Sequence, residues 1–173
     1  MSQAAATIAT VRAPSFDDLD LELASTRRIL EAVPDEHWTW KPHEKSMSLG
    51  GIANHLLDAL HQAESPVQRD RLDLSEEQEQ TAPSPGREQL LRRFDAQVEA
   101  LRAGVAARDA IGWDGMWQLT RGADVVWAMP RALAFRVLIS HLVHHRGQLS
   151  VYLRLLDIPV PGMYGPSADE RGH

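Results

Sequence analysis

The chain has 173 residues, enough for one domain with a substantial core and too few for two domains of ordinary size. Hydrophobic residues make up 43% of it and charged residues 24%, as in ordinary globular proteins, and the net charge of −6 argues against nucleic acid as a partner. The absence of cysteine excludes disulfides, thiolate metal sites and a cysteine nucleophile, and it agrees with an expected cytoplasmic location. No apolar run approaches the ~18 residues of a membrane span, so we expect no membrane partner.

The first 13 residues lack the basic and apolar segments of a signal peptide, and we expect them to form a frayed arm. An apolar stripe with helical spacing then runs from about residue 15 to Val33, where Pro34 ends it. Ser15 and Asp18 resemble a capping box at its start. A second helix is predicted from near Ser48 to Pro66.

A third helix is predicted from Ser84, which can act as its cap, with Pro85 in the first helical position. Its apolar stripe consists of Leu90, Leu91, Phe94, Val98, Leu101 and Val105. The fourth helix is expected from about Pro130 to Leu156, followed by an irregular tail over residues 159–173 that packs in part over the helices.

Four amphipathic helices predict an all-α four-helix bundle that forms a single domain over residues 1–173. The acidic link over residues 65–83 is long enough for a crossover that leaves helices two and three parallel. Between helices three and four, β-branched and aromatic residues flank Gly122, a pattern that is compatible with a short hairpin.

The fourth helix contains three histidines in "SHLVHHRGQL", residues 140–149. At about 100° per residue, His141 and His145 lie on the apolar side of this helix, whereas His144 lies toward its rim at roughly −60° from His141. A single inward histidine is usually a core residue bonded to a carbonyl. Two at positions i and i+4 are harder to satisfy in an apolar interior, and they have the spacing of two ligands for one metal ion. Spacing alone leaves both interpretations open.

A third ligand must come from another element, and helix two contains "GGIANHLLDALH", residues 50–61. His55 lies on the edge of its apolar stripe, roughly 90° from the centre, and His61 points further outward. His37 and His43 fall in a connector, where we expect them to meet solvent. His55 is therefore the better candidate, with aspartate or glutamate as the alternatives.

Three stretches of the sequence are similar to the DinB/YfiT family of metal-binding four-helix bundles. They are "WTWKPHEKSMSLGGIANHLLDAL" at 38–60, "ISHLVHHRGQLSVYLRLLDI" at 139–158 and "PVPGMYGPSADE" at 159–170, about a third of the chain. The resemblance implies one metal-binding histidine on the second helix and a pair on the fourth, which match His55, His141 and His145. His144 is not the usual ligand, and its role is left open.

Three imidazoles leave coordination positions open, which is typical of a catalytic or substrate-binding metal site. Nitrogen ligands favour zinc or nickel, with iron as a further candidate, over magnesium and calcium. The resemblance implies a thiol S-transferase, using a low-molecular-weight thiol, or a metal-dependent hydrolase acting on a small molecule. The alternative is a non-enzymatic, small-molecule-binding or stress-associated dimer with a structural or vestigial metal. The sequence identifies no catalytic residue and no substrate.

Several residues near the predicted site could either support the metal ligands or have an ordinary structural role. Gln148, Asn54, Asp58 and Tyr152 are candidate hydrogen-bond partners of the ligating histidines, although Asp58 equally suits a helix-surface contact. Trp38 and Trp40 are expected to cover the end of the bundle. Gly147 suits close approach of a second helix in a homodimer, or is a tolerated helix glycine.

Overall fold

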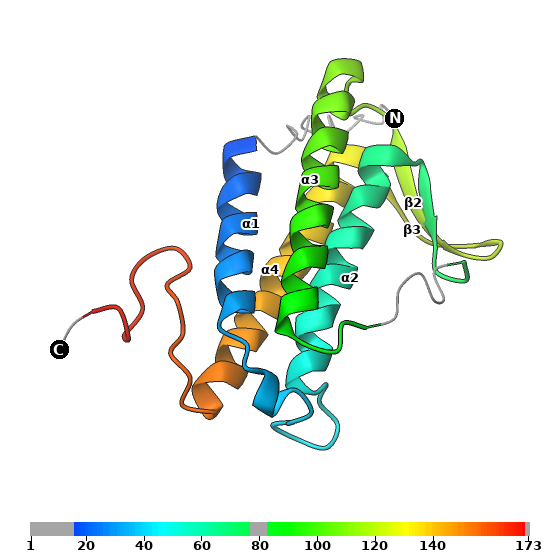
Figure 1. Ribbon diagram of the computed structural model, residues 1–173. Helices are drawn as coiled ribbons and strands as arrows, with labels where there is room; N and C mark the ends of the chain where they lie inside the picture. The colour runs from blue at the N-terminus through cyan, green and yellow to red at the C-terminus, as the bar shows by residue number, and fades with distance from the viewer. Residues whose placement is uncertain (1–15, 77–82, 172–173) are drawn as a thin grey trace, which may run out of the picture.

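A computed structural model describes residues 16–76 and 83–171, with side chains from Leu19 onward. Within these ranges the chain forms four long helices, one short 3-10 helix and three strands (Figure 1). In chain order they are α1 (Phe16–Glu31), η1 (Asp35–His37), α2 (Leu49–Gln68), β1 (Arg71–Asp73), α3 (Arg87–Ile111), β2 (Met116–Arg121), β3 (Asp124–Pro130) and α4 (Arg131–Leu155). The expected frayed arm and the Ser15–Asp18 capping box lie outside the residues or side chains described.

The four helices form the predicted bundle. Helices α2 and α3 run in the same direction, opposite to α1 and α4, as the long link between them predicted (Figure 1). Helix α1 packs against α3 and α4, and α2 packs against the same two helices. The shared core consists of the apolar stripes of all four helices, so that α2 and α4, which carry the histidines, are direct neighbours.

The all-α description is wrong in one respect, because a small three-stranded sheet lies beside the bundle. Strands β2 and β3 form the predicted hairpin, with Gly122 at a positive φ of 59° in its turn. Strand β1 comes from the link after α2 and pairs in parallel with β2, where Leu72 lies opposite Leu119. The backbone N–H and C=O groups of the link after α2 need hydrogen-bond partners, which the side chains on the bundle surface do not supply in a regular row. The open edge of β2 supplies them.

Asp73 fixes the sheet to the turn of the hairpin. Its Oδ1 accepts hydrogen bonds from the Ser75 hydroxyl (2.6 Å), the Ser75 N–H (2.9 Å) and the Gly122 N–H (2.9 Å). These bonds hold the pKa of Asp73 below its usual value.

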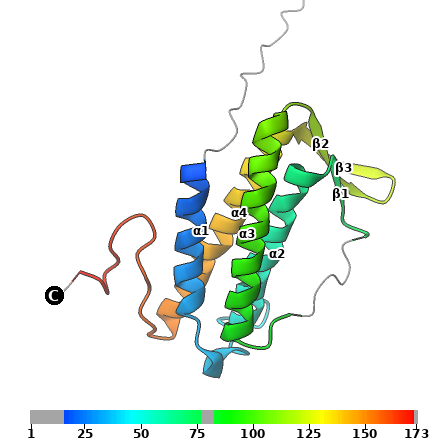
Figure 2. The same cartoon turned by 45° about the horizontal axis from the view of Figure 1, so that its top comes forward.

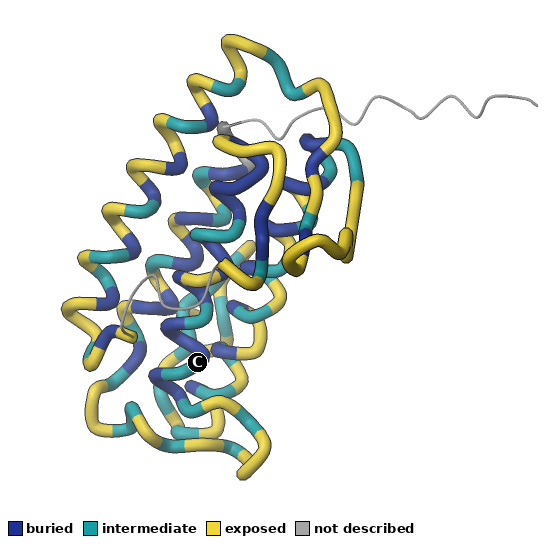
Figure 3. The backbone as a smooth tube through the Cα atoms, turned by 90° about the vertical axis from the view of Figure 1, so that its right-hand side faces the viewer, coloured by how far each residue is buried: buried dark blue, intermediate teal, exposed yellow. Residues whose placement is uncertain are grey.

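Strand β3 on the outer edge is exposed along most of its length (Figure 3).

Two predicted helix boundaries differ from the structure. Pro66 does not end α2, which continues to Gln68, and the Pro66 carbonyl accepts a hydrogen bond from Arg131 Nη1 (2.6 Å) instead. Ser84 does not cap α3, which begins at Arg87. The cap comes from a distant residue, because Asp35 Oδ1 accepts the Arg87 N–H at 2.7 Å.

The tail after α4 folds back along α1. The Ser25 hydroxyl donates to the Met163 carbonyl at 3.1 Å, and Arg28 donates to the Gly162 carbonyl at 2.9 Å. The tail and the hairpin lie on opposite sides of the bundle (Figure 1, Figure 2). No helix in the described part of the chain is long and apolar enough to cross a membrane.

Trp38 covers the beginning of α2, as expected for this residue. The Gly50 N–H donates to the Trp38 carbonyl at 2.8 Å, and a Cβ at Gly50 would lie 2.3 Å from the indole. We therefore expect Gly50→Ala to lower the free energy of unfolding by about 1–3 kcal/mol, measured in urea. Gly147→Ala is the matched control: its Cβ would meet nothing within 4 Å, so helix propensity should raise stability by up to ~1 kcal/mol. Equal stability of the two variants would contradict this account of Gly50.

Candidate metal centre

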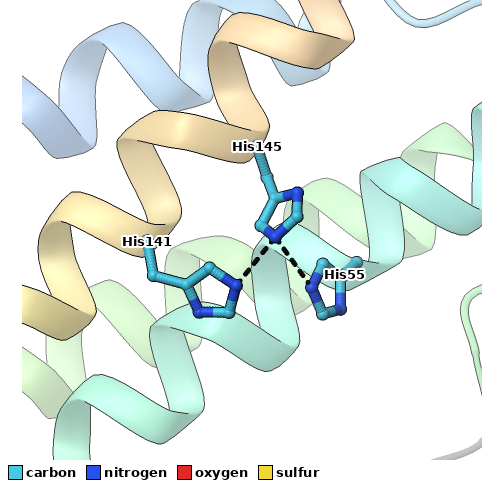
Figure 4. A group of neighbouring side chains, drawn as sticks. All are labelled: His55, His141 and His145. Carbon is cyan, nitrogen blue, oxygen red and sulfur yellow. Dashed lines mark hydrogen bonds between the residues drawn. The ribbon is translucent and has the colours of Figure 1, made fainter.

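The structure brings His55, His141 and His145 together where α2 and α4 face each other (Figure 4). The Nε2 atom of His145 lies 3.2 Å from Nε2 of His55 and 2.7 Å from Nε2 of His141. All three side chains are half-buried and offer ligand atoms within 4.8 Å of one another. Helical geometry explains the arrangement, because residues four apart on α4 project from one face toward α2.

This geometry fits one metal ion. Ligand bonds of about 2.0–2.1 Å in a tetrahedral arrangement place nitrogens roughly 3.3 Å apart, close to the spacings found here. A neutral imidazole nitrogen carries one lone pair, so hydrogen bonding to His145 Nε2 can satisfy at most one of its two close neighbours. One cation can accept the lone pairs of all three nitrogens. The cluster can therefore hold a metal ion.

Gln148 sets the orientation of His145. Its Oε1 lies 2.8 Å from His145 Nδ1, which places a proton on Nδ1 and leaves the Nε2 lone pair facing the cluster. Asp58 Oδ2 lies 3.7 Å from His55 Nδ1, a distance too long for a direct hydrogen bond. Of the four predicted partners, Gln148 therefore contacts a cluster histidine directly and Asp58 lies close to one.

The other two predicted partners belong to different contacts. Asn54 is buried and bonds to the Ser84 backbone, with its Oδ1 accepting from the N–H at 2.7 Å. The Tyr152 hydroxyl donates to the Met47 carbonyl at 3.3 Å, and its ring packs edge-on against Trp40. Asn54 thus binds the link before α3, and Tyr152 binds the connector before α2. Neither contacts a cluster histidine as predicted, because helix position alone does not show which loop a side chain meets.

Burial favours the neutral form of His141 and His145 by lowering their pKa values. It is the main cause that lowers the pKa of His141, and neighbouring His145, His55 and His144 lower it further. Burial also lowers the pKa of His145, although the hydrogen bond with Gln148 acts in the opposite direction. Neutral imidazole is the form that binds metal, so this environment favours binding at lower pH.

His144 lies outside the cluster, as its predicted position at the rim of the apolar side of the helix indicated. It is exposed, and its ring centroid lies 5.0 Å from that of His145. His61 is half-buried on α2 with Nδ1 3.6 Å from Glu64 Oε2, so it points less far outward than expected. His43 is exposed and its Nδ1 accepts the Lys45 N–H at 3.1 Å, in agreement with the loop position.

A cavity of about 480 Å³ borders the cluster between the sheet and α4. Its lining includes His141 and His144 from α4, together with the apolar residues Leu72, Trp117, Leu119, Met129, Val137 and Leu138. The sequence does not predict this cavity, because its walls come from β1, β2, β3 and α4 together. The β-branched and aromatic residues around Gly122 indicate the hairpin, but not its position against α4.

A parallel-crossover helix bundle with three converging histidines on α2 and α4 defines a class of helical proteins equipped to hold a metal ion. The chain belongs to the DinB family, whose model matches residues 21–171. It is 29% identical to YrdA of Bacillus subtilis over 152 residues, which covers 87% of this chain and 86% of YrdA. It is 25% identical to YjoA of the same organism over 134 residues, covering 75% of this chain and 80% of YjoA.

Solved structures agree with this assignment at the level of the fold. A DinB-like protein from Bacillus cereus superimposes with a TM-score of 0.67 at 21% identity, covering 86% of this chain and 95% of that chain. The crystal structure of YjoA gives a TM-score of 0.65 at 18% identity, covering 84% and 94% respectively.

We expect Gln148→Ala to weaken metal binding by about 10- to 100-fold, because the mutation frees His145 to rotate and change tautomer. Competition with a chromophoric chelator measures the effect. Gln148→Glu is the matched control, since a carboxylate at the same position also accepts the Nδ1 proton and should retain most of the affinity. Equal loss in both variants would show that Gln148 acts in another way.

Acid should destabilise the metal-free protein. The pKa of His141 and His145 is lowered in the folded state, so the unfolded chain binds more protons below the ordinary histidine value of 6.5. The free energy of unfolding should therefore fall as the pH drops below about 6.5, by at most about 1.4 kcal/mol per pH unit for each histidine. Urea unfolding with chelator at pH 8 and pH 5.5 tests this, and a His141→Ala/His145→Ala double variant should show a smaller fall.

Proposed function

We propose that the protein is a cytoplasmic, metal-dependent enzyme that acts on a small molecule, as a thiol S-transferase or a hydrolase. The observation that carries this proposal is the convergence of three imidazoles without a fourth ligand. Over residues 16–76 and 83–171, the cluster of potential metal ligands contains His55, His141 and His145 and no carboxylate. Catalytic metal sites keep a position open in this way, whereas structural sites are closed by four protein ligands.

His55, His141 and His145 would hold the ion, which we propose to be zinc or nickel, with iron as the next candidate. Neutral nitrogen ligands suit these ions and suit magnesium and calcium poorly. When bound, such an ion supplies Lewis acidity toward an oxygen or sulfur ligand.

The chain's own residues orient the site and shield it. Gln148 keeps the His145 lone pair directed at the cluster, and Asp58 lies on the outer side of His55. The cavity beside His141 supplies a space with largely apolar walls. The proposal places the small-molecule substrate in this space.

We also propose a homodimer, which the exposed outer strand supports. Val125, Val126 and Trp127 on β3 are 54%, 45% and 51% exposed, an apolar surface at a sheet edge. Sedimentation velocity of the full chain tests this assembly, and a monomer at micromolar concentration would contradict it.

Activity of the metal-reconstituted protein tests the enzymatic proposal. The protein is assayed with low-molecular-weight thiols plus electrophiles, and separately with ester and amide substrates. Turnover that requires the thiol selects the transferase, and turnover without it selects the hydrolase. His141→Ala is the control and should be inactive in either assay. Absence of turnover in both, with metal bound, would overturn the enzymatic proposal in favour of a non-enzymatic small-molecule-binding dimer.

A further inference from the structure

The cavity beside the histidine cluster is apolar on two sides. Trp117, 1% exposed, and Leu119 form its wall on β2, and Met129 extends this wall onto β3. Val137 and Leu138 on α4 form the facing wall. Its volume of about 480 Å³ lies within the usual range of small-molecule sites, ~300–1,000 Å³.

His141 belongs both to this cavity and to the cluster. Its side chain lines the cavity, while its Nε2 lies 2.7 Å from His145 Nε2. A molecule that fills the cavity therefore contacts His141, one of the three histidines whose Nε2 atoms converge in the cluster. The cavity and the cluster adjoin at this residue.

The polarity of the lining restricts what can occupy the cavity. Within residues 16–76 and 83–171, the side chains lining it include no aspartate, glutamate, lysine or arginine, and its polar side chains are His141, His144, Gln62 and Ser140, together with the indole N–H groups of Trp117 and Trp127. A carboxylate or ammonium group placed among Leu119, Met129 and Leu138 would lose hydration without gaining an ionic partner. An uncharged alkyl or aryl group would gain free energy from the same burial.

We infer that the cavity binds an uncharged, apolar alkyl or aryl portion of the substrate and directs the reacting end of that molecule to the histidine cluster. This inference rests on the function proposed above and specifies its substrate class. In a thiol transfer, the cavity holds the apolar electrophile and leaves the charged groups of the thiol outside. In a hydrolysis, it holds the acyl or aryl group.

A series of alkyl hydroxamates tests the inference by binding alone. The hydroxamate head group binds the metal, and the chain lengthens from acetyl through butyryl and hexanoyl to octanoyl. Calorimetry with the zinc-loaded protein should show affinity rising about three- to fourfold for each methylene that enters the cavity. Affinity that is independent of chain length would overturn the inference.

Two variants locate the effect in the cavity. Val137→Trp fills part of the cavity from α4. It should reduce the ratio of the affinity for octanoyl hydroxamate to that for acetyl hydroxamate at least tenfold. Val151→Trp is the matched control on the same helix, because Val151 is 56% exposed and does not line the cavity. Met129→Gln, of similar length but polar, should also reduce this ratio. Ratios that equal that of the unmodified protein in both cavity variants would contradict the assignment.

The outcome is independent of turnover. N-phenyl-1-naphthylamine, a neutral aromatic fluorophore, should bind the metal-free protein and lose binding in Val137→Trp but not in Val151→Trp. Inactivity in the assays above combined with a steep hydroxamate series would overturn the enzymatic proposal and retain the apolar site. Activity combined with a flat series and no fluorophore binding would retain the enzyme and overturn the apolar site.

Discussion

His55→Ala, His141→Ala and His145→Ala should each weaken binding of one divalent transition-metal ion by more than about 100-fold. This loss exceeds the usual cost of removing an outer hydrogen-bond partner, because each variant removes a coordinate bond itself. The three Nε2 atoms lie together between α2 and α4, and the described residues offer no fourth ligand that could compensate. Metal content after dialysis and competition with a chelator measure the change.

Thermal unfolding provides a second readout of the same binding. Metal that binds the folded state alone stabilises it by about 2.7 kcal/mol at a free concentration of 100 times Kd. The unmodified protein should therefore melt at a higher temperature with zinc than with chelator, and the three variants should lose most of this difference. His144→Ala is the matched control, because the exposed His144 ring lies outside the cluster. If His144→Ala abolished binding while His145→Ala did not, the pair at i and i+3 would be the ligands.

The histidine cluster could be predicted because it depends on local geometry. The period of α4 places His141 and His145 on one face, and both remain there in the structure. Helical period does not fix the direction of His55, which lies at the edge of the apolar stripe of α2. The rotation of α2 about its axis is set by its packing against α3 and α4. The motif resemblance indicated His55 where helical period alone did not.

Other features depend on contacts between distant segments, and the sequence did not indicate them. Strand β1 is three residues long and becomes a strand only because β2 presents an open edge. Asp35 caps α3 from 52 positions away, so a local search favoured Ser84 instead. The apolar cavity needs the sheet to be placed against α4, and no single segment encodes it.

Arg146 is a charged residue of α4 that is only 2% exposed. Its Nη1 donates to the Glu22 carbonyl at 2.9 Å, and its Nη2 lies 2.6 Å from Glu22 Oε2 and 2.7 Å from the Tyr164 hydroxyl. The Tyr164 hydroxyl in turn donates to the Glu22 carboxylate at 2.9 Å. One guanidinium thus links α4, α1 and the tail. Helical period alone does not predict this burial, because part of the cover comes from the tail.

Arg146→Ala should therefore lower the free energy of unfolding by about 3 kcal/mol, because it leaves a cavity and removes the charge partner of Glu22. Arg146→Met should cost less, since it retains the buried volume. Arg154→Ala is the matched control on the same helix: its ion pair with Asp169 of the tail is half exposed and should contribute no more than about 1 kcal/mol. Urea unfolding of the metal-free proteins measures all three. Equal losses for Arg146→Ala and Arg154→Ala would show that the buried pair does not hold the tail to the bundle more firmly than the exposed one.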